Sequence, residues 1–131
     1  MRKKNAIFPY TEQRNAELFS AFKRLIANTP RIYMPDLLRA VVAQPCSRFW
    51  VSEERATIVV SSMMRGEFMT VGLEKADMYR EIYRRATAMK TAMPEKTLAY
   101  IVGYVVNTAA PRFYMSPGHA SRIINSMRFP R

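Results

Sequence analysis

The sequence predicts an all-α protein, a single compact domain of about six helices over residues 11–131, preceded by a basic N-terminal arm at residues 1–10. Two observations predict this class. Apolar residues recur every three or four positions through most of the chain, which is the period of a helix with one buried face. Residues that start or stop helices, above all Ser, Gly and Pro, separate these stretches.

A short phrase occurs twice and organises the chain. Residues 48–52 read Arg-Phe-Trp-Val-Ser, and residues 112–116 read Arg-Phe-Tyr-Met-Ser, at an offset of 64 positions. The match continues without a gap over residues 47–65 and 111–129, which indicates an internal duplication. The serine that ends each phrase is a good N-cap, because its hydroxyl oxygen can accept from a free N–H in the first helical turn. We expect each phrase to open a helix, and the two helices to pack in equivalent ways.

The two phrases together contain four aromatic residues: Phe49, Trp50, Phe113 and Tyr114. Rings just before a helix can pack back over it, which would make them part of the core. Alternatively, beside the arginines of the phrases, they form a surface on which bases stack. Arg48 and Arg112 occupy the same position in both copies, so we expect each to contact a carboxylate or a free helix-end carbonyl within the protein.

In the first half of the chain, local patterns predict helices over residues 12–27, 35–43 and 53–65. We expect Thr11 to cap the first of these helices. Gly66 is expected to adopt the left-handed conformation that often follows a helix. The β-branched residues within 57–60 would also suit a strand, although the flanking signals favour a helix.

In the second half, the predicted helices cover residues 73–91, 98–106 and 117–127. The first of these is the longest and has an apolar inner face and a basic outer face. Residues 98–106 are apolar on every side, which is typical of a buried helix or of a buried strand. The neighbouring helices favour the helix, opened by Pro94 with Glu95 in its first turn. Pro117 suits the first position of the last helix, where its missing N–H costs nothing.

The chain carries 21 Lys and Arg residues against ten Asp and Glu, a net charge of +11. The excess is spread along the chain, with +6 in residues 1–66 and +5 in residues 67–131. A field of this size attracts polyanions, such as nucleic acids, without specifying which one. Cys46 is the only cysteine, so no internal disulfide can form and a reducing, cytoplasmic location is expected. The longest apolar run, residues 98–106, is too short to cross a membrane.

Local patterns for enzyme chemistry are missing from the sequence. His119 and Cys46 are the only histidine and cysteine and lie 73 positions apart, so no zinc-binding spacing occurs. The four glycines form no phosphate-binding loop. A Ser–His relay stays open, since its members need not be neighbours in sequence. We therefore expect a protein that is not an enzyme and that uses no cofactor or metal.

Residues 115–127 resemble the start of a recognition helix in helix-turn-helix and winged-helix regulators. They read Met-Ser-Pro-Gly-His-Ala-Ser-Arg-Ile-Ile-Asn-Ser-Met, with a Ser-Pro cap, a small residue, Ser-Arg, two aliphatic residues and Asn. The resemblance implies that polar residues of this helix reach base edges in the major groove. The residues facing DNA would be His119, Ser121, Arg122 and Asn125. The residues facing the core would be Ala120, Ile123, Ile124 and Met127. Residues 110–115 look extended, unlike the short helix and tight turn of those families, and the alternative is an ordinary amphipathic helix.

The whole chain also resembles small basic proteins of gut Bacteroidetes, on the phrases at residues 48–56 and 111–114; this resemblance implies no activity. Our first functional hypothesis is a non-enzymatic nucleic-acid-binding protein, with DNA favoured over RNA. Its candidate contact residues are His119, Ser121, Arg122, Asn125, Arg128, Arg80, Arg84, Lys3 and Lys4. The alternative is an adaptor or structural subunit that docks on an acidic protein surface or on a larger nucleoprotein assembly.

Overall fold

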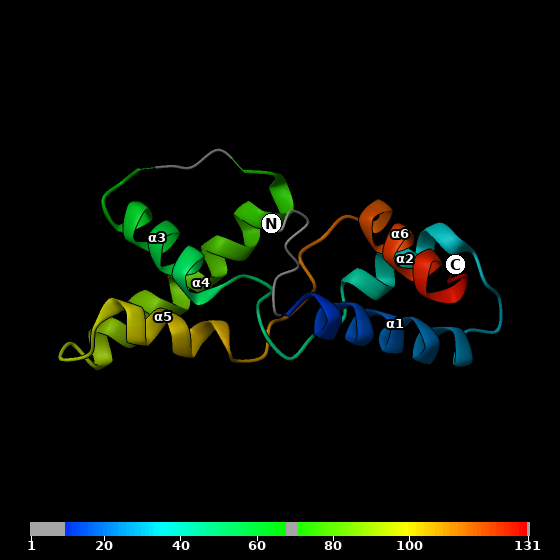
Figure 1. The fold of residues 1–131 in the computed structure, drawn as a ribbon, viewed down its shortest axis with the longest axis horizontal. Helices are drawn as coiled ribbons and strands as arrows, with labels where there is room; N and C mark the ends of the chain where they lie inside the picture. Colours follow the sequence, from blue (N-terminus) through cyan, green and yellow to red (C-terminus); the bar gives the residue numbers. More distant parts are fainter. Residues whose placement is uncertain (1–9, 68–70, 131) are drawn as a thin grey trace, which may run out of the picture. The chain divides into compact units, whose positions relative to one another are not determined.

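The computed structural model describes residues 10–67 and 71–130, and these form helices without any β-strand (Figure 1). The helices are α1 (Thr11–Ala27), α2 (Met34–Val42), α3 (Glu53–Met64), α4 (Leu73–Ala92), α5 (Leu98–Val106) and α6 (Pro117–Arg128). The predicted all-α class is confirmed, and so is the helix over residues 98–106, for which a strand was the alternative. The predicted N-terminal arm lies outside the described residues, except for Tyr10.

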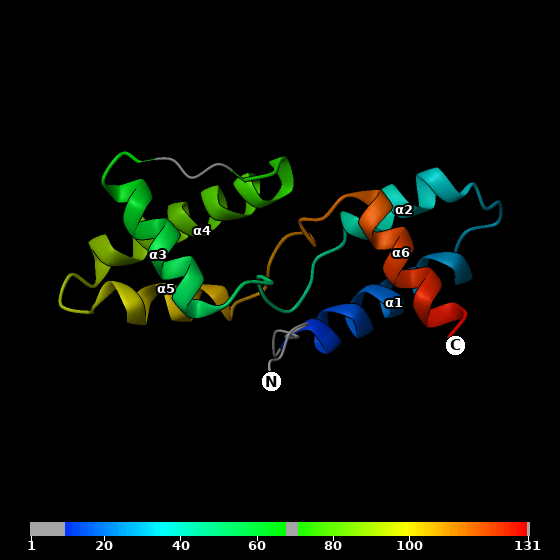
Figure 2. The same cartoon turned by 45° about the horizontal axis from the view of Figure 1, so that its top comes forward.

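The helices group into two compact units (Figures 1 and 2). A terminal unit, made of residues 1–44 and 116–131, contains α1, α2 and α6. A central unit, residues 45–115, contains α3, α4 and α5. Within each unit every helix packs against the other two, so each unit is a three-helix bundle. The domain predicted over residues 11–131 is therefore divided into two bundles, one of which joins the two ends of the chain.

The helix boundaries repeat at the offset of 64 found in the two phrases. Adding 64 to the bounds of α2 gives those of α5, and adding 64 to the bounds of α3 gives those of α6. Helix α1, shifted in the same way, covers residues 75–91 and so falls within α4. The duplication thus extends over most of the chain. Its first half comprises α1, α2 and α3, and its second half comprises α4, α5 and α6.

The two halves exchange their third helices. The terminal unit takes α1 and α2 from the first half and α6 from the second, whereas the central unit takes α4 and α5 from the second half and α3 from the first. Helix α3 packs on α4 and α5, and α6 packs on the corresponding α1 and α2. The expectation that the helices opened by the two phrases pack in equivalent ways is confirmed.

The cores of the two units use equivalent positions. Among the described helices, seven pairs of residues 64 positions apart are buried, one member in each unit: Leu18 and Ile82, Phe22 and Ala86, Leu37 and Ile101, Val41 and Val105, Ala56 and Ala120, Val59 and Ile123, and Val60 and Ile124. Burying each larger aliphatic side chain contributes about 1.5–3 kcal/mol, so these positions maintain the bundle. The outer faces are free of that constraint, and differences between the halves at exposed positions can serve different roles.

The two phrases lie antiparallel to each other inside the central unit. Cys46 and Ala110, which are equivalent positions, exchange two backbone hydrogen bonds of 3.0 and 2.9 Å. Beyond this bridge, the ring of Phe49 stacks on Tyr114 at a centroid distance of 6.0 Å, and Trp50 stacks on Phe113 at 6.5 Å. Phe49 is equivalent to Phe113, and Trp50 is equivalent to Tyr114. Exchanging the two copies therefore turns one ring pair into the other, as a local two-fold relationship requires.

This stacking decides between the two interpretations of the rings. Phe49, Trp50 and Phe113 are buried, with exposed fractions of 8% or less, and only Tyr114 is half-buried. The core interpretation is therefore confirmed for the three buried rings. A surface for stacking bases was the wrong alternative for them, because each of these rings is already covered by protein.

The predicted helix caps are mostly confirmed. The Ser52 hydroxyl accepts from the Arg55 N–H at 3.0 Å, and the Ser116 hydroxyl accepts from the His119 N–H at 3.1 Å. Gly66 follows α3 with a φ of 79°, and its N–H donates to the Met63 carbonyl oxygen, as a left-handed helix end requires.

Two cap predictions were wrong. Thr11 is the first residue of α1, and the preceding Tyr10 makes no side-chain cap. Helix α5 is capped by Thr97, whose hydroxyl accepts from the Tyr100 N–H at 3.1 Å, while Pro94 and Glu95 lie in the turn before it. Proline fits a turn as well as a first helical position, because both need the same φ, and this misled the prediction.

Candidate nucleic-acid interface

Helix α6 has the two faces that its sequence predicts. Ala120, Ile123 and Ile124 are buried against α1 and α2, as expected for the core-facing side. Arg122 and Asn125 are exposed on the opposite side. The remaining predicted residues of both faces are half-buried: His119, Ser121 and Met127. The amphipathic division of α6 is therefore confirmed, while contact with DNA stays a prediction.

The exposed side of α6 is basic and lacks any acidic residue. Arg122 makes no hydrogen bond or ion pair with a described residue, so its guanidinium can bind an external group. Ser116 and Pro117 start the helix, and the positive end of the helix macrodipole lies there. The corresponding end of α3 instead begins with Glu53 and Glu54. Of the two equivalent helices, α6 is thus the one whose N-terminal end suits a polyanion.

Arg128 belongs to a cluster of cations and rings shared by α6 and α1. Its guanidinium lies 5.5 Å from the centre of the Phe22 ring and 5.1 Å from that of Phe129. Phe22 stacks on Phe19 at 6.2 Å, and the Lys23 ammonium lies 4.9 Å over the Phe19 ring. These contacts hold two positive groups at the end of the terminal unit that carries Phe129, whose side chain is 66% exposed.

This basic-aromatic cluster was only partly predicted. The sequence identified Arg128 as a candidate contact but missed Lys23, Phe19 and Phe129. The four-residue spacing of Phe19 and Lys23 could have indicated their contact, since residues four apart on a helix are neighbours. The contact between Arg128 and Phe22 could not be anticipated in this way, because it joins helices from opposite halves of the chain.

Both units carry a net positive charge. Residues 1–44 and 116–131 contain 11 Lys and Arg residues against three Asp and Glu, a net charge of +8. Residues 45–115 contain ten against seven, a net charge of +3. Four of the basic residues, Arg2, Lys3, Lys4 and Arg131, lie outside the described residues. The described residues of the terminal unit contain seven Lys and Arg against three Asp and Glu, a net charge of +4, which is close to the +3 of the central unit.

Arg80 and Arg84, also predicted as contacts, lie on α4 in the central unit and are paired with carboxylates. Arg80 contacts Asp77 at 2.7 Å, and Arg84 donates twice to Glu81, at 2.6 and 3.2 Å. Hydrogen bonds from Arg84 and then Arg85 lower the pKa of Glu81, so this carboxylate stays charged and offsets the guanidinium charge. Both candidate arginines are exposed, but their charge is partly neutralised within the protein.

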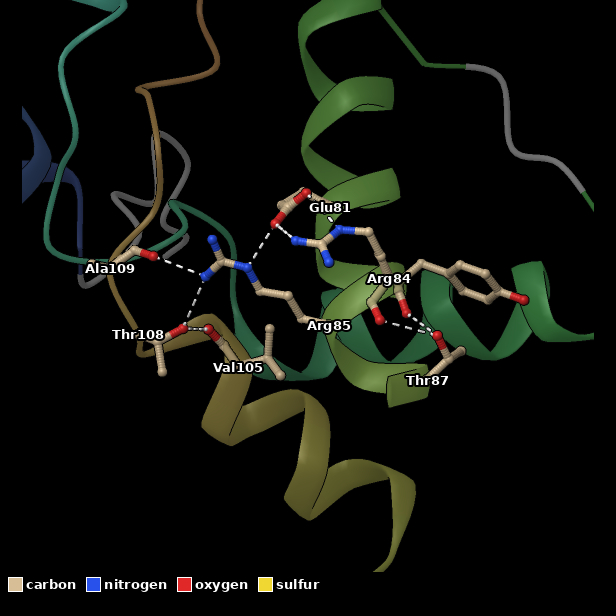
Figure 3. A network of polar contacts seen from close by, with 8 residues as sticks. Glu81, Arg84, Arg85, Thr87, Val105, Thr108 and Ala109 are labelled. Atoms are coloured by element: carbon tan, nitrogen blue, oxygen red, sulfur yellow. Dashed lines mark hydrogen bonds and ion pairs between the residues drawn. The ribbon is translucent and has the colours of Figure 1, made fainter. Parts of the chain in front are cut away.

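Arg85, which follows Arg84 on α4, makes contacts that hold parts of the central unit together. It contacts Glu81 at 2.7 Å and donates to the Ala109 carbonyl oxygen at 2.9 Å, as Figure 3 shows. Its guanidinium also lies 5.1 Å from the centre of the Phe49 ring. Arg85 therefore ties α4 to the segment that follows α5 and to the stacked rings of the phrases.

The arginines of the two phrases make intramolecular contacts, as predicted. Arg112 donates to Asp77 at 2.9 Å and lies 4.6 Å over the Tyr114 ring, which confirms the expected carboxylate partner. Arg48 donates to the carbonyl oxygens of Phe49 and Val51, at 2.9 and 2.6 Å. These carbonyls belong to the segment before α3 and not to a helix end. The expected intramolecular contact of Arg48 is therefore confirmed, whereas the expected position of its carbonyl partners at a helix end was wrong.

The described parts of the chain also bear on metal binding and on membrane insertion. Within residues 10–67 and 71–130, no three His, Cys, Asp or Glu side chains come close enough together to hold a metal ion. None of the helices in the same ranges combines the length and apolarity needed to cross a bilayer. Cys46 is buried, and its thiol lies 3.4 Å from each of the carbonyl oxygens of Arg48 and Arg112. The predicted contacts Lys3 and Lys4 lie outside the described residues.

Comparison with models of protein families, with curated proteins and with solved structures finds no match to this chain.

Proposed function

We propose that this protein binds nucleic acid, DNA in preference to RNA, through its terminal unit, and that it does so without catalysing a reaction. The observation that carries this proposal is α6: an exposed helix face with an unpaired Arg122 and no carboxylate, in a unit whose described residues carry a net charge of +4. In this proposal α6 lies in the major groove, and the basic residues around it contact phosphates.

The side chains of α6 suit base contacts. Arg122 and Asn125 are three positions apart and both exposed, so they point from the same side of the helix. Arginine can bond both acceptors on the major-groove edge of guanine, and asparagine can bond adenine in the same way. Each such pair discriminates against the wrong base by about 1–3 kcal/mol. His119 and Ser121, which are half-buried at the start of the helix, would reach the bases or phosphates beside them.

Phosphate contacts come from the basic residues near α6. Lys23 and Arg128 are held by aromatic rings in the basic-aromatic cluster, and Arg24 is exposed beside Lys23. Such contacts release counterions, so the logarithm of affinity should fall linearly with the logarithm of salt concentration. The slope would report how many of these residues contact phosphate.

Fluorescence anisotropy with labelled duplex DNA, single-stranded DNA and duplex RNA, over a series of NaCl concentrations, tests this function. We expect duplex binding with a steep salt slope, and RNA duplex binding that is weaker at each salt concentration. Arg122→Ala should weaken binding about tenfold or more. Arg55→Ala, an exposed arginine on the equivalent helix α3, is the matched control and should change affinity little. Absence of binding to any nucleic acid at low salt would remove the proposal.

A second candidate function is an adaptor that docks on an acidic protein surface. It is favoured by Ile32 and Tyr33, which are 52% and 63% exposed in the segment before α2 and follow the basic Arg31. Exposed apolar side chains next to positive charge fit a protein partner better than a phosphate backbone. Tighter binding to poly-glutamate than to duplex DNA at equal salt, lost in Ile32→Ser/Tyr33→Ser, would favour this function.

A further inference from the structure

The central unit contains a cleft that the proposed nucleic-acid contacts do not use. It lies between α5 and the beginning of α3, and its polar and aromatic lining comes from Glu53, Tyr100, Gly103, Tyr104 and Asn107. Tyr100 and Tyr104 are 52% and 56% exposed. They are four positions apart, so both rings lie on the same side of α5. The cleft therefore combines one carboxylate with two accessible aromatic rings.

The Glu53 carboxylate is held over α5. One of its oxygens accepts from the Asn107 side-chain amide at 2.8 Å, and the same amide nitrogen donates to the Gly103 carbonyl oxygen at 2.8 Å. The other oxygen approaches Gly103 so closely that a Cβ there would lie 2.9 Å from it. Glycine inside a helix costs about 1 kcal/mol relative to alanine, and here it leaves the space that the carboxylate occupies.

No described residue neutralises this carboxylate by an ion pair, although the chain has 21 Lys and Arg residues. Four other acidic residues of the central and terminal units do have an arginine partner: Asp36, Glu67, Asp77 and Glu81. The Lys96 ammonium already lies 4.9 Å over the Tyr100 ring, so at least one ring of the cleft presents its face to a cation. Charge and ring geometry together favour a positively charged occupant.

The equivalent positions in the terminal unit show that the bundle does not need this arrangement. Glu53 corresponds to Pro117 of the terminal unit. The α5 residues Tyr100, Gly103 and Tyr104 correspond to Asp36, Arg39 and Ala40 of α2, and Asn107 corresponds to Ala43. All five differ, yet α2 and α6 pack there as α5 and α3 do here. The shared three-helix packing therefore does not require the cleft residues.

We propose that this cleft binds an arginine side chain presented by a protein partner. A guanidinium can donate two parallel hydrogen bonds to the Glu53 carboxylate, which ammonium groups cannot match. Its flat face can stack on Tyr100 or Tyr104. Nucleic acid is a poor occupant, because the carboxylate repels phosphate. This site does not depend on the proposed function of α6, since it lies in the other unit.

An NMR titration of the full-length protein with a capped Gly-Arg-Gly peptide tests the site. We expect the amide signals of Gly103, Tyr104 and Asn107 to shift. A peptide with citrulline in place of arginine has nearly the same shape without the charge, and it should cause no shift. Glu53→Gln should weaken binding about tenfold, whereas Glu54→Gln, which changes the neighbouring carboxylate outside the cleft, should bind as the unchanged protein does.

Gly103→Ala separates binding from folding. Its Cβ displaces the Glu53 carboxylate, while alanine favours the helix, so the variant should be folded and at least as stable but bind the arginine peptide weakly. Equal shifts with the citrulline peptide, full binding by Glu53→Gln, or shifts in these residues with duplex DNA in place of the peptide would each overturn the proposal. Absence of any shift with the arginine peptide at millimolar concentration would overturn it as well.

Discussion

Cys46 and Ala110 are paired by two backbone hydrogen bonds and are also equivalent positions of the internal duplication. The two halves of the chain therefore meet at the same residue of each copy. The rings that follow these two residues in sequence stack in equivalent pairs, Phe49 on Tyr114 and Phe113 on Trp50. Beyond the bridge, each half contributes its third helix to the bundle formed by the first two helices of the other half.

This exchange predicts how fragments behave. Residues 1–70 contain α1, α2 and α3, and residues 71–131 contain α4, α5 and α6, so neither fragment contains the three helices of one unit. We expect each fragment alone to be largely unfolded or self-associated, and an equimolar mixture to recover the helical content and cooperative melting of the intact chain. Circular dichroism and size-exclusion chromatography measure this. A helical monomer formed by either fragment alone would contradict the exchange.

Arg112 and Arg122 separate a structural arginine from a binding one. Arg112→Ala removes the contacts with Asp77 and Tyr114, both at partly exposed sites, and should destabilise the protein by about 1 kcal/mol. Arg122→Ala removes no contact with a described residue, so it should leave the melting temperature within about 1–2 °C and weaken nucleic-acid binding. Thermal melting and anisotropy on the same samples measure both effects. The reverse pattern would contradict both the role of the repeat and the role of α6.

Glu81 predicts a stability that depends on pH. Hydrogen bonds from Arg84 and Arg85 lower the pKa of this carboxylate in the folded protein. Its contribution is therefore fully present above the ordinary pKa of a glutamate in the unfolded chain and is lost as the pH falls through the lower folded pKa. Glu81→Gln should melt at a lower temperature than the unchanged protein at pH 7, and the difference should shrink towards pH 2. Melting curves across this range measure it; a constant difference would show that the carboxylate charge is not responsible.

Gly66 and Gly118 should respond oppositely to alanine. Gly66 has a φ of 79°, where a Cβ is unfavourable, so Gly66→Ala should destabilise the protein by about 1 kcal/mol although no atom would clash with the new Cβ. Gly118 lies in the first turn of α6, and a Cβ there would meet only the Ser116 hydroxyl at 3.9 Å. Gly118→Ala should be neutral or slightly stabilising. Urea denaturation compares the two variants, and equal effects would mean that backbone conformation does not set the cost at Gly66.

The sequence by itself determined the helices of this protein and the start of the repeat. The caps at Ser52 and Ser116, the left-handed Gly66 and the amphipathic face of α6 all depend on residues within about four positions of each other. Interactions between residues so close in sequence can be predicted from the spacing of residue types along the chain. The failures at Thr11 and Pro94 came from the same range: α1 already includes Thr11, and Pro94 lies in a turn before Thr97, which caps α5.

Only the tertiary structure decided which helices share a bundle. Helix α6 packs on α1 and α2, which begin the other half of the chain, and this places the exposed Arg122 in the same unit as Lys23 and Arg24. The contacts of Arg128 with Phe22 and of Glu53 with Asn107 likewise join residues far apart in sequence. Because of the repeat, α3 and α6 have buried residues at equivalent positions. Their local sequences therefore do not show whether each helix packs on α1 and α2 or on α4 and α5. Packing between distant segments, which no local spacing records, decides which bundle each helix joins and which side chains share a surface.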